Sequence, residues 1–200
     1  PNSSFTHFKS DPYDNNSISG NVIHGIYEDD DKTLWIGTKG GGIVRINNYS
    51  SDKEPLTSFN RISAANSTLT DNAVYCFAPG ATGKLWIGTE NGINYYSYQS
   101  KQLKEFPVVA DNKKVKYVHS INELNDTTLW VSTVGEGIVK VILNNTGSSP
   151  VVKSATRIVL DKGRMASNYF FTSFHINGAR FAIQPQTLPI PEFECKQIGC

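Results

Sequence analysis

The sequence has no long hydrophobic run and almost no net charge. None of its apolar stretches approaches the roughly 18 residues of a membrane-spanning helix, and residues 1–10 have neither region of a secretory signal. The 19 Lys and Arg against 18 Asp and Glu give a formal charge of +1 at pH 7. This balance offers no electrostatic footprint for nucleic acid or anionic lipid. We therefore expect no nucleic-acid partner and no membrane contact by this segment.

Cysteine and methionine are also scarce, with three and one respectively. Three thiols are too few for a disulfide scaffold of 200 residues, and Cys76, inside an apolar run, is interpreted as a small buried hydrophobe. No zinc-spaced Cys/His cluster, redox Cys pair, nucleophile elbow or phosphate loop occurs. We expect no metal, no cofactor and no catalytic residue.

Two short motifs suggest a ligand but have simpler explanations. The acidic run Glu28–Asp31 is predicted to be a solvated hairpin turn rather than a cation site. Gly40–Gly42 lies between two predicted strands rather than before a helix, so a phosphate cradle is not expected there.

What the sequence does contain is a repeat. Leu-Trp-Ile-Gly-Thr occupies Leu34–Thr38 and returns at Leu85–Thr89, and Leu-Trp-Val-Ser-Thr follows at Leu129–Thr133. The consecutive tryptophans are 51 and 44 residues apart. Repeats of this spacing indicate one supersecondary unit used several times.

The surroundings of the pentapeptide repeat as well. A Gly-Ile pair opens another apolar run within five residues of it, and an earlier apolar run begins 13 residues before its Leu. The earlier runs start at Asn21, Asn72 and Lys116, and a fourth starts at Asn168, whose copy lacks the Trp and the Gly-Thr. Turn-forming Gly, Asn and Asp separate the runs. Each copy is therefore predicted to be four short strands in about 47 residues.

Tandem four-stranded units of this length are typical of β-propeller blades, which bury both faces against their neighbours. The predicted fold class is all-β, a partial propeller of about 3.5 to 4 blades. We expect blades at about 18–61, 69–108 and 115–160 and a partial blade at 166–183, so that repeats fill 1–183. The tail 184–200, which contains Pro and Cys, is left unassigned.

The repeat resembles the two-component regulator propeller repeat. The second copy matches it almost fully, with Leu69–Val74 followed by Gly83–Thr89, whereas the third departs at Lys116 and Ser132. That family is typified by the extracytoplasmic sensor regions of hybrid two-component histidine kinases of gut Bacteroides and relatives, in which propellers typically have seven blades. Since seven blades of this size need roughly 330 residues, we expect a piece of a larger sensor rather than a small closed ring.

The resemblance implies a non-catalytic periplasmic module that detects an oligosaccharide for a phosphorelay. A protein-binding scaffold propeller is the alternative. A propeller glycosidase or lyase would need convergent carboxylates, whereas the aligned positions carry amides and one Lys. An open fan of blades also exposes sheet edges and an apolar face, so we expect self-association or contact with the rest of the propeller.

Ligands of propellers usually bind where loops converge around the axis. The candidate ligand-binding residues are therefore those that begin the predicted innermost strands, Asn21, Asn72, Lys116 and Asn168. Capping of the preceding turn is the simpler role for the three amides.

Aromatic and imidazole side chains also recur in register. His24 and His119 share one position with Tyr75 and Phe171, and because the two histidines are two blades apart we expect core packing rather than a shared metal. The predicted structural core between blades consists of the repeat residues Trp35, Trp86, Trp130, Gly37 and Gly88.

Overall fold

The computed structural model describes residues 7–47, 49, 59–80, 83–144 and 149–158, and the backbone of strands at 172–176, 179–183 and 196–197. Every regular element in these residues is a β-strand. The part of the chain described contains no helix with the length and hydropathy of a membrane span.

Three sheets each have four strands, arranged in the order of the sequence. The first contains β1 (Ile23–Glu28), β2 (Thr33–Thr38), β3 (Ile43–Asn47) and β4 (Asn60–Ile62). The second contains β5 (Val74–Gly80), β6 (Lys84–Thr89), β7 (Gly92–Ser97) and β8 (Gln102–Phe106). The third contains β11 (Val118–Asn125), β12 (Thr128–Thr133), β13 (Ile138–Asn144) and β14 (Val151–Ile158).

Two smaller sheets complete the described elements. The two-stranded ribbon of β9 (Val109–Ala110) and β10 (Lys113–Lys114) leads from the second sheet to the third. A sheet of three strands contains β15 (Thr172–Ile176), β16 (Ala179–Ile183) and β17 (Lys196–Gln197). Part of the unassigned tail therefore pairs with the fourth copy of the repeat.

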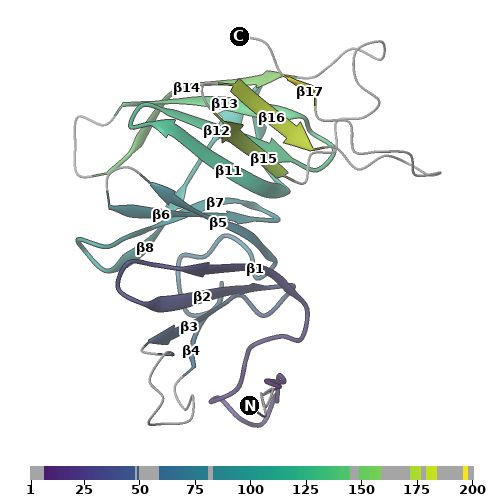
Figure 1. Ribbon diagram of the computed structural model, residues 1–200, viewed down its shortest axis with the longest axis vertical. Coiled ribbons are helices and arrows are strands. Elements are labelled where there is room, and N and C mark those ends of the chain that lie inside the picture. The colour runs from purple at the N-terminus through teal and green to yellow at the C-terminus, as the bar shows by residue number, and fades with distance from the viewer. Residues whose placement is uncertain are drawn as a thin grey trace, which may run out of the picture.

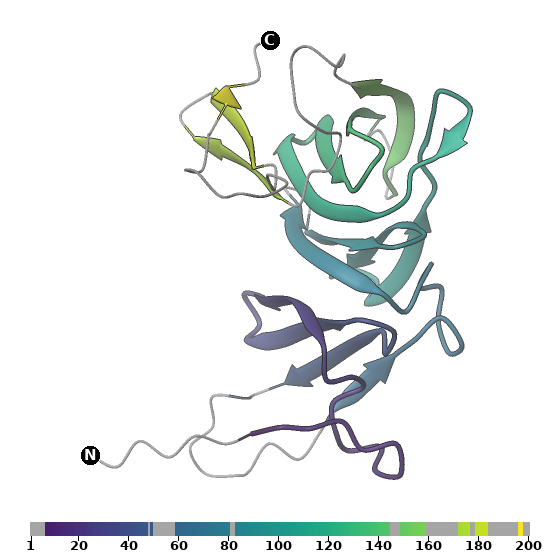
Figure 2. The same ribbon diagram turned by 90° about the vertical axis from the view of Figure 1, so that its right-hand side faces the viewer.

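The three four-stranded sheets lie one upon another in chain order, and β15–β17 lies beside β11–β14 at the end of the molecule away from β1–β4 (Figure 1 and Figure 2). Neighbouring sheets meet at their first strands, since β1 packs on β5, β5 on β11 and β11 on β15. Seen from the side, these sheets form an open fan (Figure 2). The predicted all-β class and partial propeller are confirmed, and each four-stranded sheet is one blade.

The hydrophobic core lies largely between blades. Trp35 is fully buried and packs on Phe77 and Tyr96 of the second blade, with ring centroids 6.3 and 4.9 Å away. Trp86 is also buried, and its indole N–H donates to Glu123 of the third blade at 2.7 Å. Both faces of each central strand are covered, which explains why apolar residues do not alternate with polar ones there.

The glycine of the pentapeptide makes room for the first strand of the next blade. A Cβ on Gly37 would lie 2.9 Å from a methyl carbon of Val74. A Cβ on Gly88 would lie 2.5 Å from the Cys76 sulfur in the same blade and 2.6 Å from the Val118 carbonyl oxygen in the next. Real Cβ atoms do not come this close to their neighbours, so the blades could not pack at this distance with a larger residue.

The threonine of the pentapeptide closes the hairpin between the second and third strands. In each of the three blades its hydroxyl donates to the carbonyl oxygen of the following glycine: Thr38 to Gly42 at 3.0 Å, Thr89 to Gly92 at 3.0 Å and Thr133 to Gly137 at 2.6 Å. These glycines have φ values of 79°, 140° and 81°. Residues with a side chain rarely adopt such φ values, which explains the recurring Gly-Ile pair.

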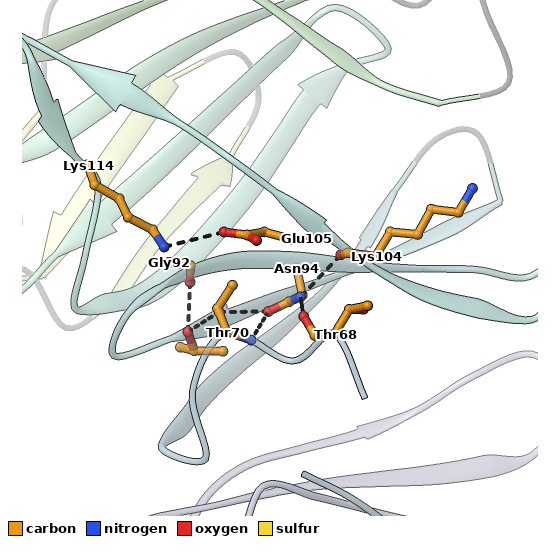
Figure 3. Close-up of polar contacts among 8 residues, drawn as sticks. Thr68, Thr70, Gly92, Asn94, Lys104, Glu105 and Lys114 are labelled. Carbon is orange, nitrogen blue, oxygen red and sulfur yellow. Dashed lines mark hydrogen bonds and ion pairs between the residues drawn. The ribbon is translucent and has the colours of Figure 1, made fainter. Parts of the chain in front are cut away.

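Asn94 ties the segment that leads into the second blade to the outer strands of that blade (Figure 3). The residue is completely buried. Its side-chain oxygen accepts from the backbone N–H and the hydroxyl of Thr70, at 3.0 and 2.7 Å. Its amide nitrogen donates to the carbonyl oxygens of Thr68 and Lys104, at 2.8 and 3.2 Å. A single side chain therefore satisfies four groups from two segments, the lead-in at Thr68 and Thr70 and strand β8 at Lys104.

Gly88→Ala should destabilise the protein by about 2 kcal/mol, because the added methyl group must displace Cys76 or the first strand of the third blade. Urea unfolding followed by tryptophan fluorescence measures the change. Ser132→Ala is the matched control, since Ser132 holds the same repeat position and already carries a Cβ, and we expect a change below about 0.5 kcal/mol. Equal stability of Gly88→Ala and the native chain would contradict this account of the glycine.

Asn94→Ala should cost about 2–4 kcal/mol, because it leaves partly buried backbone groups of Thr70, Thr68 and Lys104 without their partner. The free energy of unfolding in urea tests this prediction. The exposed Asn60 of β4 serves for comparison, and Asn60→Ala should change stability by less than about 0.5 kcal/mol. Similar losses for the two variants would show that the Asn94 bonds contribute little.

Candidate functional site

The first strand of every complete blade contains a β-bulge at the same position. Pairing shifts between Ile23 and Gly25 in β1, between Val74 and Cys76 in β5, and between Val118 and Ser120 in β11. The extra residues in these bulges are His24, Tyr75 and His119. A bulge bends its strand and re-aims a side chain away from the regular alternation.

The three bulge side chains form one continuous stack across three blades, which we name the axial ladder: His24, Tyr75 and His119. The His119 ring is stacked on the Tyr75 ring with centroids 3.9 Å apart and an interplanar angle of 23°. The His24 ring meets Tyr75 edge-on, at 5.0 Å and 80°. Edge-on and stacked aromatic pairs of this kind are attractive beyond the area that they bury.

The environment of the axial ladder shifts two of its pKa values. Burial, and to a smaller extent charge repulsion from the nearby His24, lower the pKa of His119 to about 4. Burial raises the pKa of Tyr75 to about 12, together with the hydrogen bond that its hydroxyl donates to Glu90 at 3.0 Å. At neutral pH His119 and Tyr75 are therefore uncharged.

A cavity of about 570 Å³ opens at the axial ladder. Its lining comes from the first strands of three successive blades and comprises His24, Gly25, Ile26, Tyr75, Cys76, Phe77, His119 and Ser120. This volume lies within the usual range for small-molecule sites, about 300–1,000 Å³. Burial raises the pKa of the Cys76 thiol to about 12, so this cysteine is not a reactive thiolate at neutral pH.

A rim of backbone hydrogen bonds connects the blades at the end where the first strands begin. The N–H groups of Gly40 and Gly42 in the first blade donate to the Asn72 carbonyl oxygen of the second, at 3.0 and 2.8 Å. The Tyr117 N–H of the third blade donates to the Glu90 carbonyl oxygen of the second, at 2.8 Å. Gly40 and Gly42 thus hold the next blade, in keeping with the expectation that they cradle no phosphate.

The predicted ligand-binding residues lie at this rim, but the two described amides each bond to their own lead-in segment rather than converge on one site. The side-chain oxygen of Asn21 accepts from the Ser10 N–H at 2.7 Å, and that of Asn72 accepts from the Ala64 N–H at 2.8 Å. Both amides therefore cap their own lead-in segments. Lys116 is half-buried beside Tyr117, and Asn168 lies outside the described residues. A ligand-binding role for these four residues stays a prediction.

The structure corrects the expectation for the two histidines. We predicted that His24 and His119 are core residues kept apart by the intervening blade, but His24 is exposed and Tyr75 joins the two rings in one stack. The physical reason is that the first strands converge, so equivalent positions of successive blades come into contact. Phe171, which shares this position in the fourth copy, lies outside the described residues.

The acidic run also differs from its prediction at one residue. Asp29 is buried rather than solvated, and its carboxylate accepts from the Thr33 N–H and the Trp35 indole N–H, both at 2.8 Å. It stabilises the hairpin from within, whereas Asp30 and Asp31 are exposed as predicted. Among the described residues, no group of three or more His, Cys, Asp and Glu is placed to hold a metal ion.

Trp130 is less enclosed than the other two repeat tryptophans. Its side chain is only partly buried, and the Lys140 ammonium lies 5.8 Å from its ring centroid. Sequence reasoning could not distinguish this tryptophan from Trp35 and Trp86, because the flanking residues are nearly the same.

Two segments of the chain, residues 17–40 and 68–91, match the family model described as two component regulator propeller. Each segment includes a lead-in, a bulged first strand and the pentapeptide. Both segments are similar to the two-component regulator propeller repeat. His24 and Tyr75 of the axial ladder lie within the two matched segments, and His119 lies outside them.

Similar proteins support the same fold. Histidine kinase P4 of Formosa agariphila is 29% identical over 127 residues, which are 62% of this chain and 9% of that protein. The extracellular domain of a hybrid two-component system from B. thetaiotaomicron has 18% identity and a TM-score of 0.69, covering 90% of this chain and 23% of that one. Virginiamycin B lyase from Staphylococcus aureus has 14% identity and a TM-score of 0.55, covering 80% and 48% respectively. At these identities the structural likeness shows the shared propeller fold alone.

Acidification should destabilise the protein between pH 6.5 and about 4 through His119. The folded state keeps this imidazole neutral down to about pH 4, whereas the unfolded chain protonates it near 6.5, so stability is lost as the pH falls through this window. Urea midpoints measured from pH 7.5 to 4.0 should fall less steeply for His119→Phe than for the native chain. His7→Gln, which changes an exposed histidine, should leave the native slope, and the same slope in all three proteins would contradict the assignment.

Proposed function

We propose that this chain is part of the periplasmic sensor propeller of a two-component system and that it detects an oligosaccharide. The observation that carries the proposal is the match to the regulator propeller family, made by two segments whose repeated residues pack the blades. The histidine kinase relative and the extracellular sensor domain support the same class. The chain spans 9% and 23% of their lengths, so the membrane span, kinase and phosphorelay of a parent protein are part of the proposal.

Binding fits the axial residues better than catalysis does. Hydrolysis of a glycosidic bond needs a pair of carboxyl groups on either side of that bond. The cavity lining supplies two imidazoles, a tyrosine ring and one hydroxyl, and Glu90 is engaged by the Tyr75 hydroxyl. Resemblance to a lyase at 14% identity does not alter this, because one propeller fold serves many functions.

A protein-binding scaffold is the second candidate function, and one observation favours it. Val22, Ile23 and Ile26, in and beside β1, are 54%, 38% and 65% exposed. Large apolar side chains exposed together on one strand are typical of protein interaction sites. Such a surface would also allow the self-association expected of an open fan of blades.

Calorimetric titration of the whole chain with a panel of neutral and acidic oligosaccharides tests the sensor proposal. We expect saturable binding of at least one oligosaccharide, and a gain of about 2.7 kcal/mol in unfolding free energy at a ligand concentration of 100 Kd. Panel members that give no heat provide the matched negative controls for the stability measurement. Failure of every oligosaccharide to bind would contradict the proposal and favour the scaffold function.

A further inference from the structure

We infer that the ligand binds in the cavity at the axial ladder and that it is an uncharged molecule with closely spaced hydroxyl groups on an apolar ring. This inference rests on the proposed sensor function and adds to it a location and a ligand class. The proposed binding site is therefore the axial ladder of bulged residues rather than the rim residues Asn21 and Asn72.

The bulges are the first reason for this location. A regular strand would pair its second residue with the neighbouring strand, whereas each of these strands leaves its second residue outside the pairing. The bulge removes one residue from regular pairing in each of the three blades. In every blade the unpaired residue, His24, Tyr75 or His119, lines the same cavity. Bulges concentrate next to functional sites for this reason.

The charge of the lining limits the ligand class. None of the eight lining residues is an Asp, Glu, Lys or Arg, and His119 resists protonation down to about pH 4. The Glu90 carboxylate beside the ladder accepts a hydrogen bond from the Tyr75 hydroxyl. Beside Tyr75 and His119, which are uncharged at neutral pH, a carboxylate, phosphate or ammonium on the ligand would have to be desolvated without a counter-charge, which is costly. The cavity therefore favours an uncharged ligand.

The polar and apolar groups of the lining match a sugar ring in particular. The neutral imidazole of His119 offers one donor and one acceptor, and the His24 imidazole offers an N–H donor in either protonation state, so both are chemically suited to hydroxyl groups. Ile26 and Phe77 supply an apolar wall in the same cavity. A neutral hexose or pentose ring has hydroxyl groups around its edge and an apolar C–H face. The imidazoles can bind the hydroxyls, and the apolar wall can contact the C–H face.

The rim residues are less suited to the same task. The side-chain oxygens of Asn21 and Asn72 already accept backbone N–H groups, so binding a ligand through these atoms would compete with the caps that hold the lead-in segments. A ligand that binds the exposed His24 does not have to displace a cap of this kind.

The test follows the imidazole C–H resonances of the whole chain by NMR at pH 7 during titration with neutral xylo-, manno-, malto- and arabino-oligosaccharides. Galacturonic acid oligomers form the charged arm. We expect saturable shifts of the His24 and His119 resonances with a neutral oligosaccharide, no shift of the exposed His7, and no binding of the charged oligomers. His24→Ala should weaken binding about tenfold, and the rim variant Asn21→Ala should change it less than about twofold.

The outcomes separate this inference from the proposed function. Binding that leaves both ladder histidines unshifted, or that Asn21→Ala weakens and His24→Ala does not, overturns the location while the sensor proposal stands. Shifts of His24 and His119 with the charged oligomers alone overturn the ligand class. No binding of any oligosaccharide overturns the sensor proposal, and this inference with it. Circular dichroism of each variant confirms that a lost affinity is not a lost fold.

Discussion

The short distance between neighbouring first strands is the constraint on which the rest of the molecule depends. At Gly88 a single added carbon would approach Cys76 and the Val118 carbonyl to within 2.5 and 2.6 Å. If the strands moved apart to admit it, Trp86 would lose its contact with Glu123 and the ladder rings would lose their stacking. The buried tryptophans, the backbone rim and the axial cavity all require blades packed at this distance.

Most of the architecture could be predicted because this constraint recurs in the sequence. Each copy needs a small residue opposite the next blade, a threonine to close the hairpin and a glycine with positive φ, so the pentapeptide and the Gly-Ile pair return together. Features that occur once left no such signal. Asn94 fixes the lead-in of the second blade, whereas Arg61 does so in the first, donating to the Ser17 and Asp14 carbonyl oxygens at 2.8 and 2.7 Å. Two unrelated side chains with one task cannot be recognised by comparing copies.

The candidate site was harder to predict than the fold. The alignment of copies placed His24, Tyr75 and His119 at one position, which is correct, but it gave no reason for their rings to meet. A bulge is a mismatch between two strands, and the sequence of one strand alone does not reveal it. The capping oxygens of Asn21 and Asn72 were more accessible to reasoning, because amides that precede a strand commonly accept local backbone N–H groups.

The backbone rim has a consequence for how this propeller can respond to a ligand. Hydrogen bonds from Gly40 and Gly42 to Asn72, and from Tyr117 to Glu90, tie successive blades together at that end. A molecule that settles on the axis therefore meets a preformed site, which spares it the entropy of ordering loops. Opening one blade alone would break these hydrogen bonds. A movement that the ligand causes without breaking these bonds displaces the three connected blades together as one rigid body. The outer edges of the fan then move with them.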